Sequence, residues 1–398
     1  MIGPAKIPAL DGVRALSVTL VILAHLPRSD NAVLYQGLWL VNQAARGAYV
    51  ALDVFFVLSG FFITRLLIDE RASTGRISIT DFYTRRALRI FPIYYLAVGI
   101  CWFVFHFSGA ELAALFSYTF NYYHPFNPTP NPLEQSWSLS VEEQFYLVWP
   151  FLITAIPLRF GSLVTGRIVP LLAIASGAAI SIWLWRSDPM LAGNVVYMSL
   201  PTRMLSLSLG GWLAFREFEG RPLRGLPCLA MLVGAVVVLA ADRLGRDAGI
   251  IRSQSAYWTV ALASWVMISI AFVATVVFDA GRLGKGLNRL LSIAPLRGVG
   301  RISYALYLYH LPVIFWFGLN EAVIHDGRAP FSHILAVVAI VVALATLSWF
   351  LIERPLQRLR QRRDRRIAGD APGVTTVAST AGPDRCSGAV GSDVASGR

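Results

Sequence analysis

The chain has 398 residues, of which 56% are hydrophobic and 15% are charged, and its mean hydropathy of +0.58 excludes an ordinary soluble globular protein. Lys and Arg number 35 against 23 Asp and Glu, which gives a formal net charge of +12. In so apolar a chain this excess indicates membrane topology and lipid contact, and no basic helix with interleaved aromatic residues supports nucleic-acid binding.

Ten apolar stretches follow one another, each close to the roughly 20 residues that cross a bilayer. They cover approximately residues 10–26, 47–68, 88–107, 137–157, 168–186, 195–215, 226–241, 256–278, 302–319 and 331–352. An even number of spans places both termini on one side. With the termini in the cytoplasm, 25 Lys and Arg residues fall on the inner side and seven on the outer side, in agreement with the positive-inside rule. The sequence therefore predicts an all-α polytopic membrane protein with both termini cytoplasmic.

The first span carries Arg14 and His25. Eleven residues of helix amount to about 20° more than three turns, so both side chains share one face, with about 16 Å of helix axis between them. The alternative for Arg14 is a snorkelling anchor at the inner interface. The alternative for His25 is a cap at the outer helix end, beside Pro27.

The second span runs inward and carries Asp53 a turn or two inside its outer end. A carboxylate at that depth could orient the His25 imidazole and stabilise its protonated form. Alternatively, Asp53 is a favourable charge at the start of the helix.

Three arginines enter the third span shortly before Pro92: Arg85, Arg86 and Arg89. Arg86 and Arg89 share one helical face at i and i+3, and two guanidinium groups at that spacing can bind phosphate in bidentate fashion. The alternative is that these arginines only set the membrane topology, but three arginines exceed what orientation requires.

The segment before the fourth span, residues 108–135, contains no Lys or Arg and is rich in proline. We expect an irregular or polyproline outer loop, which either shapes an acceptor site or merely connects two spans.

Further ionisable residues lie in later spans, where burial in a bilayer makes each one a candidate functional group. Glu142 and Glu143 are about 100° apart round a helix, so one of them is expected to point inward, and the sequence does not choose between them. Arg203 either serves function or simply pairs with one of these acids. For His310 we favour a structural hydrogen bond to a neighbouring helix.

The chain changes character after residue 357. A basic stretch is followed by a segment rich in Gly, Ala, Ser and Thr that ends at Arg398. We expect a membrane domain over residues 1–357, and a tail over residues 358–398 that is basic on the inner leaflet and then disordered. The three cysteines lack the spacing of a disulfide framework or a zinc site, so no metal is expected.

Six motifs in this order resemble the membrane acyltransferase family 3. They are residues 10–14 (LDGVR) with His25, residues 53–60, residues 86–89 (RALR) with Pro92, residues 138–146, residues 302–310 and residues 352–355 (IERP). The resemblance covers about residues 6–357. In one departure, Ala51 and Leu52 stand where the family often has glycines. In another, no extracellular hydrolase-like domain follows the last span, so transfer would be completed by the membrane domain or by a separate transferase partner.

The resemblance implies about ten helices, a cytoplasmic acyl-CoA donor (most commonly acetyl-CoA) and no permanently bound cofactor. It assigns functional roles to Arg14, Arg86 and Arg89, which suit the phosphates of coenzyme A, and to His25. We expect His25 to act as general base, with Asp53 or Glu142 holding its tautomer.

The expected acceptor is a hydroxyl of a surface carbohydrate, a lipid-linked sugar or a glycosylated metabolite, and the expected location is the bacterial plasma (inner) membrane. The rival hypotheses are a proton-coupled transporter or flippase and a non-catalytic assembly protein.

Overall fold

The computed structural model describes residues 7–31, 48–184, 188–247, 254–279, 281–320 and 327–359. The chain divides into a compact unit of residues 1–357 and a second unit of residues 358–398. Apart from Arg358 and Leu359, the tail that we expect to be disordered lies outside the described residues.

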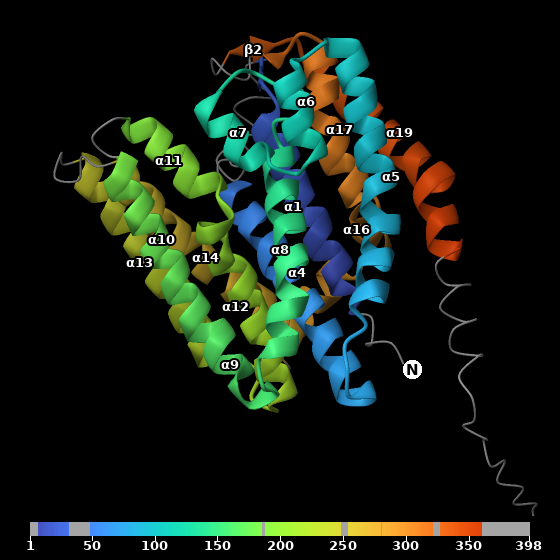
Figure 1. Cartoon of the computed structure of the whole chain (residues 1–398). Helices are drawn as coiled ribbons and strands as arrows, with labels where there is room; N and C mark the ends of the chain where they lie inside the picture. Colours follow the sequence, from blue (N-terminus) through green and yellow to red (C-terminus); the bar gives the residue numbers. More distant parts are fainter. Residues whose placement is uncertain are drawn as a thin grey trace, which may run out of the picture. The chain divides into compact units, whose positions relative to one another are not determined.

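The first unit is built from α-helices (Figure 1), and a helix occupies each predicted span. These are α1 (Ala9–His25), α4 (Ala48–Thr74), α5 (Ile79–Phe105), α8 (Ser136–Ala155), α10 (Val169–Leu184), α12 (Leu200–Phe218), α13 (Leu226–Asp247), α14 (Gln254–Phe278), α17 (Ser303–Trp316) and α19 (Phe331–Ser348). Among the described residues, 5 helices are long and apolar enough to cross a membrane. Others are shorter, such as α1 with 17 residues and α17 with 14. The all-α polytopic class is confirmed.

Shorter elements connect the long helices. They are η1 (Leu158–Phe160), α9 (Gly161–Leu163), the π-helix η2 (Val164–Ile168), α11 (Pro189–Met198), α15 (Arg282–Leu291), α16 (Ala294–Arg301) and the π-helix η3 (Trp349–Glu353). Two short strands that the sequence did not predict, β1 (Arg28–Ser29) and β2 (Arg328–Ala329), pair in parallel with Arg28 opposite Arg328.

The prediction of an irregular loop over residues 108–135 is wrong for most of this segment. It contains α6 (Gly109–Phe116) and α7 (Phe120–Phe126). Ser108 and Glu111 form a capping box at the start of α6, and the Phe120 side chain is fully buried. Local capping and burial of aromatic rings therefore outweigh the prolines, which follow mainly after residue 124. The longest part without a helix is residues 127–135.

The start of α1 is held by close backbone contact with α15 and α16. A Cβ atom on Gly12 would lie 2.0 Å from the carbonyl oxygen of Leu291, and one on Gly300 would lie 1.9 Å from the carbonyl oxygen of Asp11. Both distances are too short for any side chain, so glycine is required at both positions. This packing fixes the part of α1 from which Arg14 projects.

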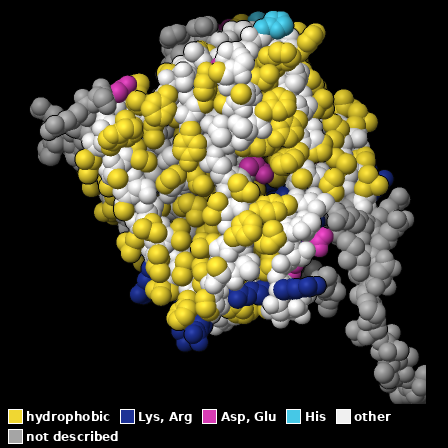
Figure 2. All heavy atoms as spheres, in the orientation of Figure 1, with side chains coloured by type: hydrophobic (Ala, Val, Ile, Leu, Met, Phe, Trp, Pro, Cys, Tyr) yellow, Lys and Arg dark blue, Asp and Glu magenta, His cyan; other side chains and the backbone are white. Residues whose placement is uncertain are grey.

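The two ends of the bundle differ in charge. On the face drawn in Figure 2, most Lys and Arg side chains lie at the lower end, and hydrophobic side chains cover much of the surface above them. At this lower end α4 joins α5 and α12 joins α13, whereas α6, α7 and the strand pair lie at the upper end (Figure 1). We call these the basic end and the loop end. The distribution agrees with the orientation predicted from the arginine bias.

Candidate active site

Arg14 of α1 and Arg86 and Arg89 of α5 lie close enough together for their charges to interact. We call these three residues the basic cluster. Arg14 and Arg86 are half-buried and Arg89 is exposed. The structure therefore brings together the three arginines that the sequence proposed for donor binding.

The guanidinium groups of Arg14 and Arg86 rest on aromatic rings, and the basic cluster has few anionic partners. Arg14 lies 4.9 Å from the ring centroid of Phe62, and Arg86 lies 4.4 Å from that of Tyr146. Arg14 also forms a long ion pair of 3.8 Å with Asp11. Within the described ranges, Arg86 and Arg89 form no ion pair. A ring below a guanidinium leaves its N–H edges free, so the cluster is suited to an anionic ligand.

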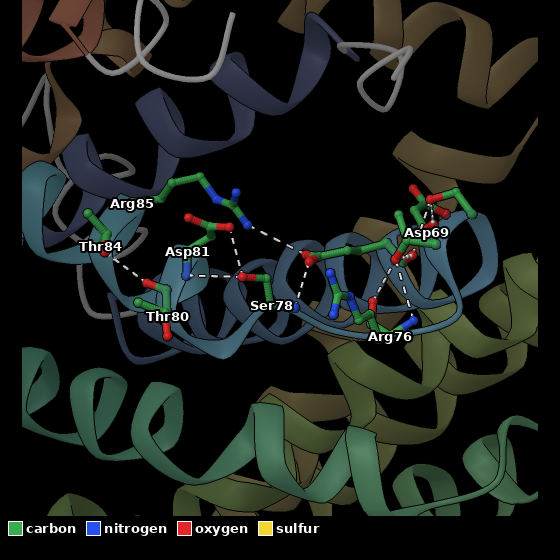
Figure 3. A network of polar contacts seen from close by, with 10 residues as sticks. Asp69, Arg76, Ser78, Thr80, Asp81, Thr84 and Arg85 are labelled. Carbon is green, nitrogen blue, oxygen red and sulfur yellow. Dashed lines mark hydrogen bonds and ion pairs between the residues drawn. The ribbon is translucent and has the colours of Figure 1, made fainter. Parts of the chain in front are cut away.

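A polar network holds the start of α5 (Figure 3), the helix that carries Arg86 and Arg89. Ser78 caps α5 by donating to Asp81 at 2.7 Å and accepting from the Asp81 backbone N–H at 3.4 Å. Glu70 of α4 accepts the Ser78 backbone N–H at 2.7 Å and lies 3.5 Å from the Arg85 guanidinium. Arg85 is therefore paired with an acid of the protein, which separates it from Arg86 and Arg89.

Glu142 and Glu143 of α8 lie near the basic cluster, since the charges of both interact with Arg86. Glu142 accepts a hydrogen bond of 2.6 Å from Ser59 of α4. Glu142 is thus directed toward α4, and our expectation that it holds His25 is corrected. The physical reason is position: Glu142 lies nearer the basic end, where a carboxylate is stabilised by the neighbouring cations.

Asp53 is also engaged elsewhere. Its Oδ1 atom accepts from Arg203 Nη1 at 3.0 Å and from the Ser206 hydroxyl, and both members of the ion pair are fully buried. Three aromatic rings surround the Arg203 guanidinium, those of Tyr197, Trp137 and Phe56.

The expected contact of Asp53 with His25 is therefore not formed among the described residues, because an unpaired Arg203 would be far costlier to bury. Arg203 does pair with an acid, but with Asp53 and not with Glu142 or Glu143. Asp53 is not at the start of its helix either, since α4 begins at Ala48.

His25 is the last residue of α1 and faces another histidine. Its Nδ1 atom lies 2.8 Å from the carbonyl oxygen of Val21, and its ring centroid lies 5.1 Å from that of His310, with 60° between the planes. A carbonyl oxygen only accepts, so Nδ1 carries the proton and Nε2 of neutral His25 keeps a lone pair. Backbone, not a carboxylate, sets the tautomer of His25.

His310 is anchored from two sides. Its Nδ1 atom lies 2.6 Å from the carbonyl oxygen of Tyr307 in its own helix. The Tyr307 hydroxyl lies 2.6 Å from that of Ser138, and Gln135 donates to the carbonyl oxygen of Leu308 at 2.8 Å. These buried bonds fasten α17 to the start of α8. The sequence analysis missed the pairing of His310 with His25, and the only available signal was that both lie in apolar spans.

An acid from the loop before α8 lies near His25. Glu134 lies close enough for its charge to interact with His25, and its Oε1 atom is 3.3 Å from Nε2 of His124. The Glu134 side chain is 44% exposed, so solvent screens it. Among the described residues, no group of three or more His, Cys, Asp or Glu side chains could hold a metal ion.

Helix α1 links the two groups of residues. It contributes Arg14 to the basic cluster and His25 to the histidine pair, about 16 Å apart along the helix axis. The arrangement can bind a polyanion at the basic end and supply an imidazole base at the loop end.

The model of the Acyl_transf_3 family, described as an acyltransferase domain, matches residues 7–353. The chain belongs to this family. The resemblance found in the sequence motifs is thereby confirmed over nearly the whole membrane unit. No solved structure matches the chain significantly.

Several curated proteins are similar to the chain. The peptidoglycan O-acetyltransferase OatA of Listeria monocytogenes is 28% identical over 375 residues (88% of this chain, 56% of OatA). The O-acetyltransferase OatA of Staphylococcus aureus (strain NCTC 8325) is 29% identical over 387 residues (90% of this chain, 58% of OatA). YrhL of Bacillus subtilis is 29% identical over 381 residues (88% of this chain, 55% of YrhL). The chain thus spans between 55% and 58% of the length of these relatives.

Proposed function

We propose that the protein is a membrane-embedded O-acyltransferase that moves an acyl group, in the first place acetyl, from acyl-CoA to a hydroxyl of a cell-surface carbohydrate. One observation carries the proposal: α1 contributes Arg14 to the basic cluster and His25 to the histidine pair. Membership of the acyltransferase family and similarity to O-acetyltransferases support it.

The basic cluster would bind the donor. Coenzyme A carries a diphosphate and a 3′-phosphate, and Arg86 and Arg89 have no ion pair among the described residues. Phosphate oxygens would replace water on these guanidinium groups. By the positive-inside rule the basic end would face the cytoplasm, where acyl-CoA is found. The protein would lie in the bacterial plasma (inner) membrane. The donor arrives as a substrate, and no permanently bound cofactor is needed.

His25 would be the general base. Its Nε2 lone pair takes the proton of the acceptor hydroxyl while the oxygen attacks the thioester carbonyl. The new C–O bond forms, the C–S bond breaks, and the leaving thiolate takes the proton back from His25. Such proton transfer typically contributes about 10² to 10⁴ in rate. Asp53 and Glu142 would not take part in this step directly, since each has another partner.

The test is acetyl transfer by the full chain reconstituted in lipid nanodiscs. Labelled acetyl-CoA and soluble peptidoglycan fragments serve as donor and acceptor, with other hydroxylated carbohydrates in parallel. We expect labelled ester from the wild type, and a loss of at least about 10²-fold for His25→Ala. His106→Asn is the matched control, because His106 is exposed and has a φ of 52°, which asparagine tolerates.

Different outcomes distinguish the rival hypotheses. Absence of labelled product with every acceptor, together with proton-driven uptake of a sugar into vesicles, would favour a transporter. Product that forms only after addition of a second protein would show that a separate transferase partner completes the transfer. Turnover by His25→Ala equal to that of the wild type would refute the role of His25.

A further inference from the structure

His310 is a fully buried imidazole that no step of the proposed reaction uses. Its Nδ1 atom donates to the carbonyl oxygen of Tyr307 at 2.6 Å, so the proton of the neutral ring is on Nδ1 and Nε2 keeps its lone pair. This Nε2 atom is buried and has no hydrogen-bond partner among the described residues. Buried acceptors are almost always satisfied in folded proteins, so this lone pair is suited to accept a hydrogen bond from a donor that forms during the reaction.

His25 can become that donor. In its neutral state it has only one N–H group, which donates to Val21. Once His25 takes a proton on Nε2, it has a second N–H group, and this group needs an acceptor. The ring centroids of His25 and His310 are 5.1 Å apart, which leaves room for a hydrogen bond of about 2.9 Å between two ring nitrogens.

We infer that His310 is a positioning residue whose Nε2 lone pair stabilises the imidazolium that His25 forms during acyl transfer. Both N–H groups of the imidazolium are then satisfied, one by the Val21 carbonyl oxygen and the other by His310. The imidazolium then gives its Nε2 proton to the leaving thiolate of the donor, and His25 returns to its neutral form. This inference rests on the proposed function of His25 as general base.

Other groups around the histidine pair fit this role less well. Glu134 is 44% exposed and already lies 3.3 Å from His124, so water and a second imidazole compete for its charge. The Tyr307 hydroxyl is bound to Ser138 and to the carbonyl oxygen of Gln135. His310 alone combines ring contact with His25, complete burial and an unpaired acceptor within the described part of the chain.

Two substitutions separate this role from a purely structural one. In His310→Asn, the amide nitrogen takes about the place of Nδ1 and keeps the bond to Tyr307, but the acceptor at Nε2 is lost. In His310→Gln, the amide reaches about the place of Nε2 and keeps an acceptor there. We expect kcat to fall about 10²-fold for His310→Asn and less than about tenfold for His310→Gln. The KM for acetyl-CoA, the dissociation constant of free coenzyme A and the melting temperature in detergent should stay near the wild-type values in both.

A second measurement does not need acetyl transfer. Diethyl pyrocarbonate acylates unprotonated imidazole, and mass spectrometry of the digested protein reports the modification rate of His25. The rate is measured across a pH series, because it falls to half where half of His25 is protonated. Loss of the acceptor destabilises the imidazolium, so we expect this midpoint to lie at least about 0.7 pH unit lower in His310→Asn, and within about 0.3 pH unit of the wild-type midpoint in His310→Gln, with His106 as internal reference.

Equal behaviour of the two variants, whether both are active or both inactive, would overturn the inference, and so would an unchanged pH midpoint of His25 modification in His310→Asn. A wild type without acetyl transfer but with the expected difference in His25 modification would refute the proposed function and leave the histidine pair established.

Discussion

The arginines inside this bundle fall into two kinds, and the difference indicates which of them bind a ligand. Arg203 is fully buried, lies 3.0 Å from the equally buried Asp53 and is surrounded by aromatic rings. Arg86 and Arg89 are accessible and form no ion pair in the part of the chain that the structure describes. An arginine that is paired with an acid of the protein has a structural role. An arginine without such an ion pair is available to bind phosphate.

The largest effect is expected from breaking the buried pair. Asp53→Ala leaves the guanidinium of Arg203 buried without its charged partner, which should destabilise the protein by about 3–5 kcal/mol. Thermal unfolding in detergent, followed by size-exclusion chromatography, measures the loss. The double variant Asp53→Leu with Arg203→Met removes both charges and should recover most of the stability. If Asp53→Ala unfolded like the wild type but lost activity, the pair would belong to the active site instead.

Removing an arginine of the basic cluster that has no ion pair should weaken binding of acetyl-CoA and leave the fold intact. Arg86→Ala or Arg89→Ala should raise the KM for acetyl-CoA about tenfold to a hundredfold, because a charge-assisted hydrogen bond to phosphate is lost. The melting temperature should change little. Lysine at either position should restore affinity only in part, because it lacks the bidentate geometry of arginine.

The exposed Arg159 at the same end of the bundle provides the matched control. Its replacement by alanine should leave the KM unchanged. If the KM for acetyl-CoA in Arg86→Ala and Arg89→Ala equalled that of the wild type, these residues would serve membrane topology and not donor binding.

Glu111 of α6 extends the comparison to a carboxylate outside the membrane-spanning helices. Burial alone would raise its pKa, but hydrogen bonds from Ser108, Asn131 and Thr129 outweigh this and lower the pKa below the ordinary value of 4.5. A lowered folded-state pKa stabilises the protein above the unfolded value and ceases to do so as the pH falls through the folded value. The melting temperature of the wild type should therefore fall between about pH 5 and about pH 3 more than that of Glu111→Gln. If the melting temperatures of the two proteins changed with pH in parallel, the Glu111 carboxylate would not contribute to stability.

The smallest effect is expected at Glu70, which lies 3.5 Å from Arg85. Glu70→Gln removes this charge pair at the edge of the bundle, but keeps an acceptor for the Ser78 backbone N–H. The loss of stability should stay below about 1 kcal/mol. Glu70→Ala also loses the acceptor and should cost more. A large rise in the KM for acetyl-CoA in Glu70→Gln would show that the network of Figure 3 also tunes the basic cluster.

Local pattern made much of the helix bundle predictable. Apolar runs of bilayer length located each long helix, and helical spacing alone placed Arg14 and His25 on one face of α1. Arg86 and Arg89 could be proposed for the same reason, because i and i+3 positions meet on any helix. The two helices of the outer segment were missed, although Ser108 and Glu111 have the spacing of a capping box, because the prolines that follow were given more weight.

By itself, the sequence determined where the long helices are, which ends of them are basic and which side chains share a helix with one another. Only the tertiary structure decided the partners across helices: Asp53 with Arg203, Glu142 with Ser59, and His25 with His310. The reason is physical. Helical periodicity relates residues within a few turns of each other, whereas a buried polar group takes its partner from whichever helix packing brings beside it, and residues 285 positions apart in the chain, such as these two histidines, share no local signal.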